Sequence, residues 1–161
     1  MISMIIAMTK DNLIGKTDTK NGLPWHYSED LRYYRSKTIN KINVQGHKTY
    51  LEIGKALPNR DTYVMSRDVN LKLDDAIVIN NVEDILKLDS DKIEIMITGG
   101  IEIFKLYENH IERIYLTKIN KSYDGDIYYH DLNLKNFKLI KKMAGSNKDL
   151  SFEVYENEKN K

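Results

Sequence analysis

The chain has 161 residues, and its 25 lysine and arginine residues nearly balance its 24 aspartate and glutamate residues, for a formal net charge of +1. This balance gives no overall electrostatic case for binding nucleic acid or an anionic membrane surface. The lack of cysteine excludes a disulfide framework, a thiolate metal site and a cysteine nucleophile. The length suits a sizeable buried core, and we expect a single domain over residues 1–161.

An apolar run over residues 1–8 opens the chain. It has no basic residues ahead of it, as a signal peptide would, and the polar residues 9–12 end it before it could span a bilayer. We therefore expect a buried first strand in a cytoplasmic protein that has no membrane partner.

Further apolar runs bounded by turn residues recur along the chain. The early runs are nearly continuous and rich in β-branched residues, which is typical of strands covered on both faces in a parallel sheet. With the first run, the sequence predicts strands over residues 1–8, 42–46, 62–66, 76–79, 93–98, 111–119, 137–143 and 150–156.

Helical patterns lie between the early strands. Ser28 is the expected N-cap of the first helix, with Glu29 and Asp30 in its opening turn. Gly54 is expected to close the second helix, and Asn81 to cap a third whose inner face carries Val82, Ile85 and Leu86. The sequence thus predicts helices over 28–38, 48–54, after Asn81, and over 101–107.

The last third of the chain lacks such helices. Its three apolar runs follow one another with a turn signal at Asp124-Gly125-Asp126, which indicates antiparallel strands added to one edge of the sheet. We therefore predict an α/β fold: a mixed, mostly parallel β-sheet flanked by helices, with antiparallel C-terminal strands.

Asp30 is a candidate acid. An acidic residue in the first turn of a helix often only complements the helix dipole in water. Glu29 already fills that position, however, and Asp30 adjoins Leu31 and shares a helix face with Tyr33 and Tyr34. Apolar surroundings disfavour an ionised carboxylate, which can then hold a cationic or amidine-like group or supply a proton.

Three predicted strands end in residues suited to a ligand: Gly46-His47-Lys48-Thr49, Ser66-Arg67, and Gly99-Gly100-Ile101. Glycine lets a ligand approach the backbone, and helix N-termini, hydroxyls and cations suit phosphate groups. Each segment alone also fits a turn with solvated charges. Because parallel strands end at the same edge, we expect the three to define one crevice.

Other chemistries find little support. The four histidines show no metal-ligand spacing, so we expect no metal, and the chain has no nucleophile elbow, Walker loop or Gly-x-Gly-x-x-Gly motif. Trp25 is expected in the core or a pocket wall, where its indole N–H needs a partner.

Ordered motifs along nearly the whole chain resemble the dihydrofolate reductase family. They include the opening strand through Ala7, Asp11 to Gly15, Leu23-Pro24-Trp25, Asp30-Leu31, Gly46 to Tyr50, Ile53-Gly54, Leu57 to Arg60, Ser66-Arg67, Gly99-Gly100, Tyr115-Leu116-Thr117 and Asp124-Gly125-Asp126. The resemblance implies reduction of dihydrofolate to tetrahydrofolate by hydride transfer from NADPH, which feeds one-carbon metabolism and thymidylate synthesis.

The resemblance also implies roles for single residues. Asp30 would bind the pterin and promote protonation of its N5 atom with an ordered water, which Trp25 would help to hold, and Thr117 would support this network. Arg60 would pair with the α-carboxylate of the glutamate tail. The residues implied to bind the substrate are Ile5, Ala7, Leu31, Tyr34, Ile53, Leu57, Arg60 and Thr98.

The implied cofactor site includes a mobile loop over residues 9–23, which would close over the nicotinamide and pack against Asp126. Phosphates would be bound at residues 47–49, Ser66 and Arg67, and the two glycines, usually joined by a cis peptide, would admit the nicotinamide. The implied cofactor residues are Ala7, Ile14, Gly15, Leu23, Gly46, His47, Lys48, Thr49, Ser66, Arg67, Gly99, Gly100, Ile101 and Phe104.

Several residues depart from the family pattern. The stretch 16–22 is slightly longer than in the common bacterial type, Gln45 is polar where an apolar residue is usual, and Tyr50 replaces a tryptophan or phenylalanine. His47 replaces the usual arginine, which bears on recognition of the 2′-phosphate. Thr98 replaces an aliphatic residue. Its hydroxyl either lacks a partner once a ligand excludes water, and so weakens binding, or bonds back to its strand or a neighbouring carbonyl.

Two alternatives to an active dihydrofolate reductase remain open. One is a related pyrimidine or pterin reductase, against which Asp30 and Arg60 together argue because they match both ends of folate. The other is a binding or structural protein that kept the fold and lost turnover. For the leading hypothesis we expect dihydrofolate and NADPH as ligands, antifolate inhibitors, no nucleic-acid partner and a monomer.

Overall fold

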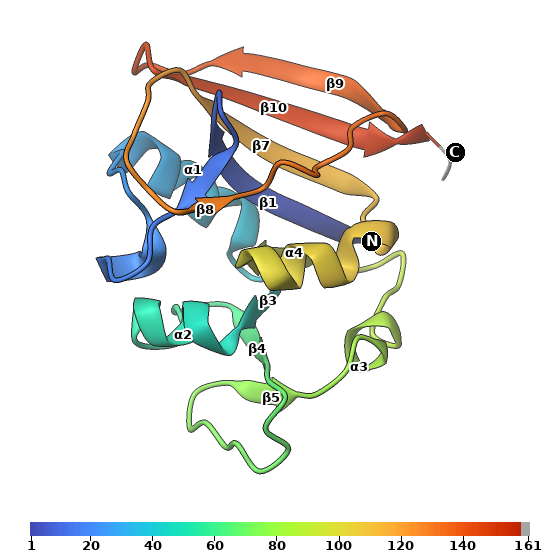
Figure 1. Cartoon of the computed structure of the whole chain (residues 1–161). Coiled ribbons are helices and arrows are strands. Elements are labelled where there is room, and N and C mark those ends of the chain that lie inside the picture. The colour runs from blue at the N-terminus through green and yellow to red at the C-terminus, as the bar shows by residue number, and fades with distance from the viewer. Residues whose placement is uncertain (159–161) are drawn as a thin grey trace.

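An eight-stranded sheet forms the centre of the molecule, which we describe from a computed structural model over residues 1–158 (Figure 1). The strand order is β5-β4-β3-β6-β1-β7-β10-β9. The strands are β1 (Ile2–Thr9), β3 (Ile42–Gly46), β4 (Asp61–Met65), β5 (Ile77–Ile79), β6 (Ile95–Gly99), β7 (Arg113–Ile119), β9 (Phe137–Ala144) and β10 (Leu150–Asn157).

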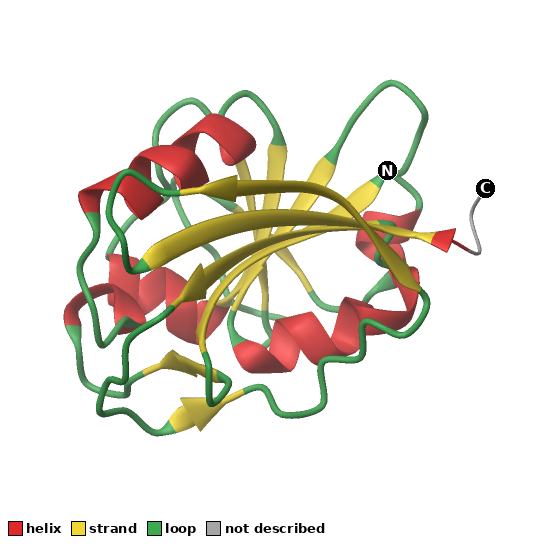
Figure 2. Cartoon of the chain, turned by 90° about the horizontal axis from the view of Figure 1, so that it is seen from above, coloured by secondary structure: helices red, strands yellow, loops and turns green. Residues whose placement is uncertain are grey.

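Pairing within the sheet changes once from parallel to antiparallel. Neighbours from β5 across to β7 are parallel, whereas β10 runs antiparallel to both β7 and β9. The mixed sheet with antiparallel C-terminal strands that the sequence predicts is therefore confirmed. Helices lie on both faces of the twisted sheet (Figure 2).

The helices are α1 (Ser28–Thr38), α2 (His47–Ile53), α3 (Glu83–Leu86) and α4 (Ile101–Tyr107), with 3-10 turns η1 (Lys20–Gly22) and η2 (Glu108–His110). All four predicted helices are present. The expectation that Ser28 caps α1 is wrong: Tyr27, with extended backbone, is the N-cap, and Ser28 is already helical. Gly54 ends α2 in the left-handed conformation at φ 93°, where a side chain would be strained.

The cap of α3 differs in detail from the prediction. Val82 occupies the N-cap position, but the side-chain oxygen of Asn81 accepts a hydrogen bond from the backbone N–H of Asp84 at 3.0 Å. On the inner face of the helix Ile85 is fully buried, and Val82 and Leu86 pack against the core. Asn81 thus supplies the capping bond from one position further out.

Alternation along β6 shows why its sequence is almost entirely apolar. Ile95 and Ile97 join the large core cluster that includes Ile103 and Phe104 of α4, whereas Met96 between them joins a cluster against Tyr33 and Tyr34 of α1. All three β6 side chains are fully buried. Both faces of the strand are therefore covered by helices, as the continuous apolar run predicts.

A second, two-stranded sheet was not predicted. β2 (Leu13–Gly15) pairs antiparallel with β8 (Ile127–Tyr128), joining the segment after β1 to the segment after β7. Runs of three and two residues are too short to show a period of two. Among residues 1–158, no helix is long and apolar enough to cross a membrane.

Candidate active site

One large cavity of about 1240 Å³ opens where β3, β4 and β6 end. Its wall includes the start of α2 after β3, Ser66 and Arg67 after β4, and the diglycine after β6. The three strand-end segments singled out in the sequence therefore line one crevice, as expected for the carboxyl edge of a parallel sheet.

Most of the predicted site residues lie in this wall. Of the residues predicted for catalysis and substrate binding, it includes Asp30, Thr117, Ile5, Ala7, Leu31, Tyr34, Ile53, Leu57 and Thr98. Every predicted cofactor residue also lines it: Ala7, Ile14, Gly15, Leu23, Gly46, His47, Lys48, Thr49, Ser66, Arg67, Gly99, Gly100, Ile101 and Phe104. The structure thus places these side chains together, while their roles stay predictions.

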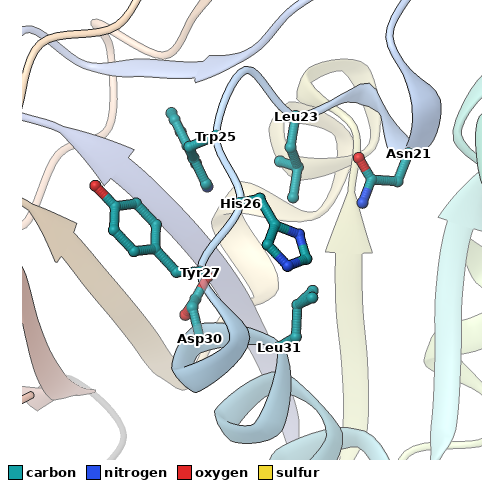
Figure 3. A pocket seen from close by; sticks show the side chains of 7 residues that line it. All are labelled: Asn21, Leu23, Trp25, His26, Tyr27, Asp30 and Leu31. Atoms are coloured by element: carbon teal, nitrogen blue, oxygen red, sulfur yellow. The ribbon is translucent and has the colours of Figure 1, made fainter. Parts of the chain in front are cut away.

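Two predicted residues fall outside the described wall of the large cavity. Trp25 lines a small recess beside it together with Asp30 and Leu31, which belong to both spaces (Figure 3). Arg60 is not among the residues of this wall, and its Nε donates a hydrogen bond to the Thr38 hydroxyl at 3.1 Å.

Asp30 is held between α1 and β7. The hydroxyl of Thr117 donates a hydrogen bond of 2.7 Å to Oδ1 of Asp30. Burial raises the pKa of Asp30 above its ordinary value, the bond from Thr117 lowers it, and the charge of Glu29 raises it, with burial the largest effect. A carboxyl group with a raised pKa can carry a proton closer to neutral pH, which suits acid–base work.

Its neighbour Glu29 points to different partners. The Glu29 carboxylate accepts hydrogen bonds from the backbone N–H groups of Ser146 and Asn147, at 2.7 and 2.9 Å, in the turn between β9 and β10. These bonds lower the pKa of Glu29, the opposite direction to Asp30. Two adjacent carboxylates therefore differ in function: Glu29 joins α1 to the hairpin turn, and Asp30 faces the cavity.

Trp25 supplies a buried donor at the recess. The side chain is 6% exposed and packs edge-on against Tyr123. Within residues 1–158, its indole Nε1 has no hydrogen-bond partner. An unpaired buried N–H is costly, so a donor here next to Asp30 fits a polar ligand group or solvent.

The opposite end of the cavity is polar and cationic. His47 and Lys48 begin α2, and Arg67 follows β4, with the hydroxyls of Thr49 and Ser66 in the same wall. The His47 ring stacks on the Tyr50 ring with centroids 6.5 Å apart. This donor set fits the phosphates of a dinucleotide.

Glycine shapes the wall between the two ends. Gly99 has φ 123°, a conformation that side chains rarely adopt, and its peptide bond to Gly100 is cis, as the family resemblance implies. At Gly46, an added Cβ would approach Cγ1 of Ile103 to 3.1 Å. Glycine backbone without side chains thus forms part of the cavity wall, which lets a ligand approach it closely.

The predicted contact between the 9–23 segment and Asp126 is confirmed. The backbone N–H and the hydroxyl of Thr17 donate to the two carboxylate oxygens of Asp126, at 2.8 and 2.6 Å. These bonds lower the pKa of Asp126. Further along the segment, Gly22 packs so closely on Glu52 of α2 that an added Cβ would lie 2.1 Å from the glutamate oxygen.

The Thr98 hydroxyl bonds to a neighbouring carbonyl, which is the second of the two alternatives that the sequence leaves open. Its hydroxyl donates a hydrogen bond of 3.2 Å to the backbone carbonyl of Val44 on the adjacent strand β3. A hydrogen bond with Thr98 also lowers the pKa of Tyr34, against the larger raising effect of burial. The hydroxyl thus has partners within the wall, so we expect it to weaken the binding of a ligand ring little.

Sequence reasoning missed part of the wall. Asn80, Asn81 and Val82 line the cavity directly after β5, and Glu52 lines it one helical turn after Lys48. The strand-end rule applied to β5 as well would have found the first group. The helical spacing of four residues from Lys48 would have found Glu52.

Comparison with known proteins gives a consistent result. Residues 1–158 match the family model described as dihydrofolate reductase. The chain is 32% identical over 161 residues to the dihydrofolate reductase of Bacillus subtilis, covering 97% of this chain and 94% of the relative. Against that of Staphylococcus haemolyticus it is 31% identical, covering 96% and 95%. A dihydrofolate reductase structure from Enterococcus faecalis, complexed with NADP(H) and RAB-propyl, superimposes with a TM-score of 0.88 at 28% identity, covering 98% of this chain and 96% of that one.

Proposed function

Because this chain belongs to the dihydrofolate reductase family, whose members reduce dihydrofolate to tetrahydrofolate with NADPH, we propose that Asp30 is the group that binds the pterin and promotes protonation of N5. The single observation that supports this role is the hydrogen bond from Thr117 to an Asp30 carboxyl whose pKa is raised by burial. A carboxylate there can accept hydrogen bonds from the 2-amino and N3 groups of a pterin.

Thr117 and Trp25 complete the proposed acid–base group. Thr117 fixes one carboxyl oxygen of Asp30, which leaves the other for the pterin. The unpaired indole N–H belongs to Trp25, which lines the same recess as Asp30, and it is suited to hold an ordered water (Figure 3). Such a water can carry a proton to N5 within hydrogen-bond reach.

The cofactor residues are proposed from the fit of the cavity. NADPH, when bound, supplies the hydride. His47, Lys48 and Arg67, with the hydroxyls of Thr49 and Ser66, would hold its phosphates at the cationic end. The diglycine would admit the nicotinamide half, because glycine has no side chain and a ligand can approach its backbone closely. The positive φ of Gly99 also favours glycine at this position.

The rest of the substrate would lie along α1 and α2. Leu31, Tyr34, Ile53 and Leu57 would pack against its apolar parts. Arg60 would pair with the α-carboxylate of the glutamate tail, because a guanidinium binds a carboxylate in a bidentate manner. Its bond to Thr38 uses Nε and orients the group.

Antifolate binding belongs to the same proposal. The Enterococcus faecalis relative was solved with RAB-propyl as well as NADP(H). Diaminopyrimidine antifolates carry a ring that resembles the pterin and would meet Asp30 in the same way. A cytoplasmic location and a monomeric state stay predictions.

An assay that follows both the cofactor and the product tests the activity directly. Purified protein, NADPH and dihydrofolate are combined, and loss of NADPH absorbance is followed while tetrahydrofolate is measured chromatographically. We expect NADPH to be consumed, and tetrahydrofolate to form, only when NADPH and dihydrofolate are both present. If dihydrofolate is not consumed, but a pyrimidine or pterin is reduced instead, the related-reductase alternative holds. If both ligands bind without turnover, the protein is a binding protein.

A further inference from the structure

Asp75 makes two hydrogen bonds that join separate parts of the molecule. It lies in the loop between β4 and β5 and accepts a bond from the Tyr50 hydroxyl at 2.5 Å on Oδ1. Its Oδ2 accepts a bond from the backbone N–H of Ala56 at 2.8 Å. One carboxylate thus connects α2 to the segment that follows it.

The Ala56 segment bears directly on the cavity. Between Gly54, whose N–H donates to the Tyr50 carbonyl, and Asn59, whose carbonyl accepts from Asn40, the chain carries Leu57 into the wall. The bond from Ala56 to Asp75 lies in the middle of this stretch, one residue before Leu57. The position of Leu57 therefore depends on a contact with a loop outside the wall.

Tyr50 has a second contact at the other end of the cavity. Its ring stacks on His47 with an interplanar angle of 25°. The ring therefore packs on His47, a residue of the cationic end, while the hydroxyl reaches Asp75 and, through it, the Leu57 segment.

We propose that Tyr50 and Asp75 are positioning residues with two separable effects. The Tyr50 ring supports His47 for cofactor binding, whereas the Tyr50 hydroxyl and Asp75 fix the Ala56–Leu57 segment for dihydrofolate binding. This inference rests on the proposed function, because it takes the His47 end as the cofactor site and Leu57 as part of the substrate site.

Electrostatics favours this pair over a wide pH range. The bond from Tyr50 is the largest of the effects that lower the pKa of Asp75, and the bond from Ala56 adds to it. The same bond raises the pKa of Tyr50. At neutral pH the carboxylate is therefore ionised and the phenol protonated, the states in which both bonds form. Because the pair is near the surface, water competes for it and its effect is moderate.

Three variants separate the two effects. Tyr50→Phe keeps the ring and removes the hydroxyl, Tyr50→Leu removes both, and Asp75→Asn keeps an acceptor for Tyr50 but loses the one for Ala56. Tyr128→Phe, which removes an exposed tyrosine hydroxyl on β8, is the matched control. For each variant, steady-state kcat and both KM values are measured, with the melting temperature and the dihydrofolate Kd from fluorescence of the one tryptophan, Trp25.

We expect Tyr50→Phe and Asp75→Asn each to raise the KM and Kd for dihydrofolate by about three- to tenfold, the range of one hydrogen bond. Their KM for NADPH and their kcat should stay within about twofold of wild type, because neither change touches His47, Asp30 or Thr117. Tyr50→Leu should raise the KM for NADPH as well. In the double variant Tyr50→Phe/Asp75→Asn, the KM for dihydrofolate should be no higher than in the more affected of the two single variants. Both changes interrupt the same connection between Tyr50 and Ala56, so their effects should not multiply.

Several results would overturn the proposal. They are a dihydrofolate KM in Tyr50→Phe no different from that of Tyr128→Phe, an equal rise in both KM values, or multiplied effects in the double variant. A lowered melting temperature with unchanged KM values would mean that the pair serves stability alone. Wild-type protein that reduces dihydrofolate while these variants match it contradicts only this inference; wild-type protein without that activity contradicts the proposed function.

Discussion

The hydroxyl of Thr117 on β7 donates a 2.7 Å hydrogen bond to Oδ1 of Asp30 on α1. These residues lie 87 positions apart in the chain, yet their contact fixes the acid of the cavity against the sheet. Burial raises the pKa of this acid, and Thr117 partly opposes the rise. The contact therefore holds the carboxyl in place, while burial has the larger effect on its pKa.

Replacing Asp30 with asparagine should remove acid–base function while leaving NADPH binding intact. We expect kcat at neutral pH to fall by about 10²–10⁴-fold, the usual contribution of a positioned proton transfer. In the wild type, activity should decline as pH rises above the raised pKa, because protonation becomes limiting. A variant rate within a few-fold of wild type at neutral pH would contradict the assignment.

The same variant should be more stable at neutral pH. A carboxyl whose pKa is raised on folding weakens the folded state once it is ionised, so the penalty is absent below the ordinary value of 3.8 and grows as pH rises toward the folded pKa. Melting temperatures of Asp30→Asn and wild type should thus differ at neutral pH and converge in acid. Equal melting temperatures of the two proteins at neutral pH would mean that the Asp30 carboxyl is well solvated.

Thr117→Val should move the pH profile in a definite direction. The bond from Thr117 lowers the pKa of Asp30, so its loss should raise that pKa and shift the alkaline limb of kcat/KM to higher pH. Thr117→Ser, which keeps a hydroxyl, should retain the wild-type profile. An unshifted limb in Thr117→Val would show that the bond does not tune Asp30.

Cofactor preference should depend more on Arg67 than on His47. A guanidinium contact to the 2′-phosphate contributes at most about 1.5–3 kcal/mol, because the group is always charged and offers two parallel N–H donors, whereas an imidazole ring offers no such paired donors. Arg67→Ala should therefore erode the ratio of kcat/KM for NADPH over NADH further than His47→Ala does. Equal kcat/KM for the two cofactors in the wild type would refute a 2′-phosphate contact at this end.

Thr98→Val should not tighten antifolate binding. The hydroxyl already donates to the Val44 carbonyl, so its loss removes a bond within the protein and affects the folded protein more than the ligand. We expect diaminopyrimidine inhibition constants within about twofold of wild type and a slightly lower melting temperature. A clearly tighter constant would mean that a ligand breaks this bond on entering.

Asp126→Ala should loosen the 9–23 segment. Both bonds from Thr17 would be lost, and because they lower the pKa of Asp126, their contribution is present at neutral pH and fades in acid. Trypsin should then cut faster after Lys16 and Lys20, whereas Asp124→Ala, a change to an exposed neighbour, should match wild type. Equal cleavage rates in the two variants would show that Asp126 does not hold the segment.

The sequence by itself determined the sheet and the place of the site. Continuous β-branched runs such as that over β6 specify strands buried on both faces, and a strand end rich in glycine or cations is a local property of the chain. The parallel arrangement then brings such ends to one edge. Asp30 could also be identified, because its apolar neighbours Leu31, Tyr33 and Tyr34 are close in sequence.

Only the tertiary structure decided which polar groups meet. The β2–β8 pair, the bond from Thr98 to Val44 and the bridge through Asp75 join residues far apart in the chain, and none of these residues carries a local pattern that specifies its partner. Hydrogen bonds are short and directional, so small differences in how elements pack decide whether a hydroxyl meets a carbonyl, a carboxylate or the cavity. Apolar burial is non-directional and can be read from composition and period; hydrogen-bond partners depend on the packed fold.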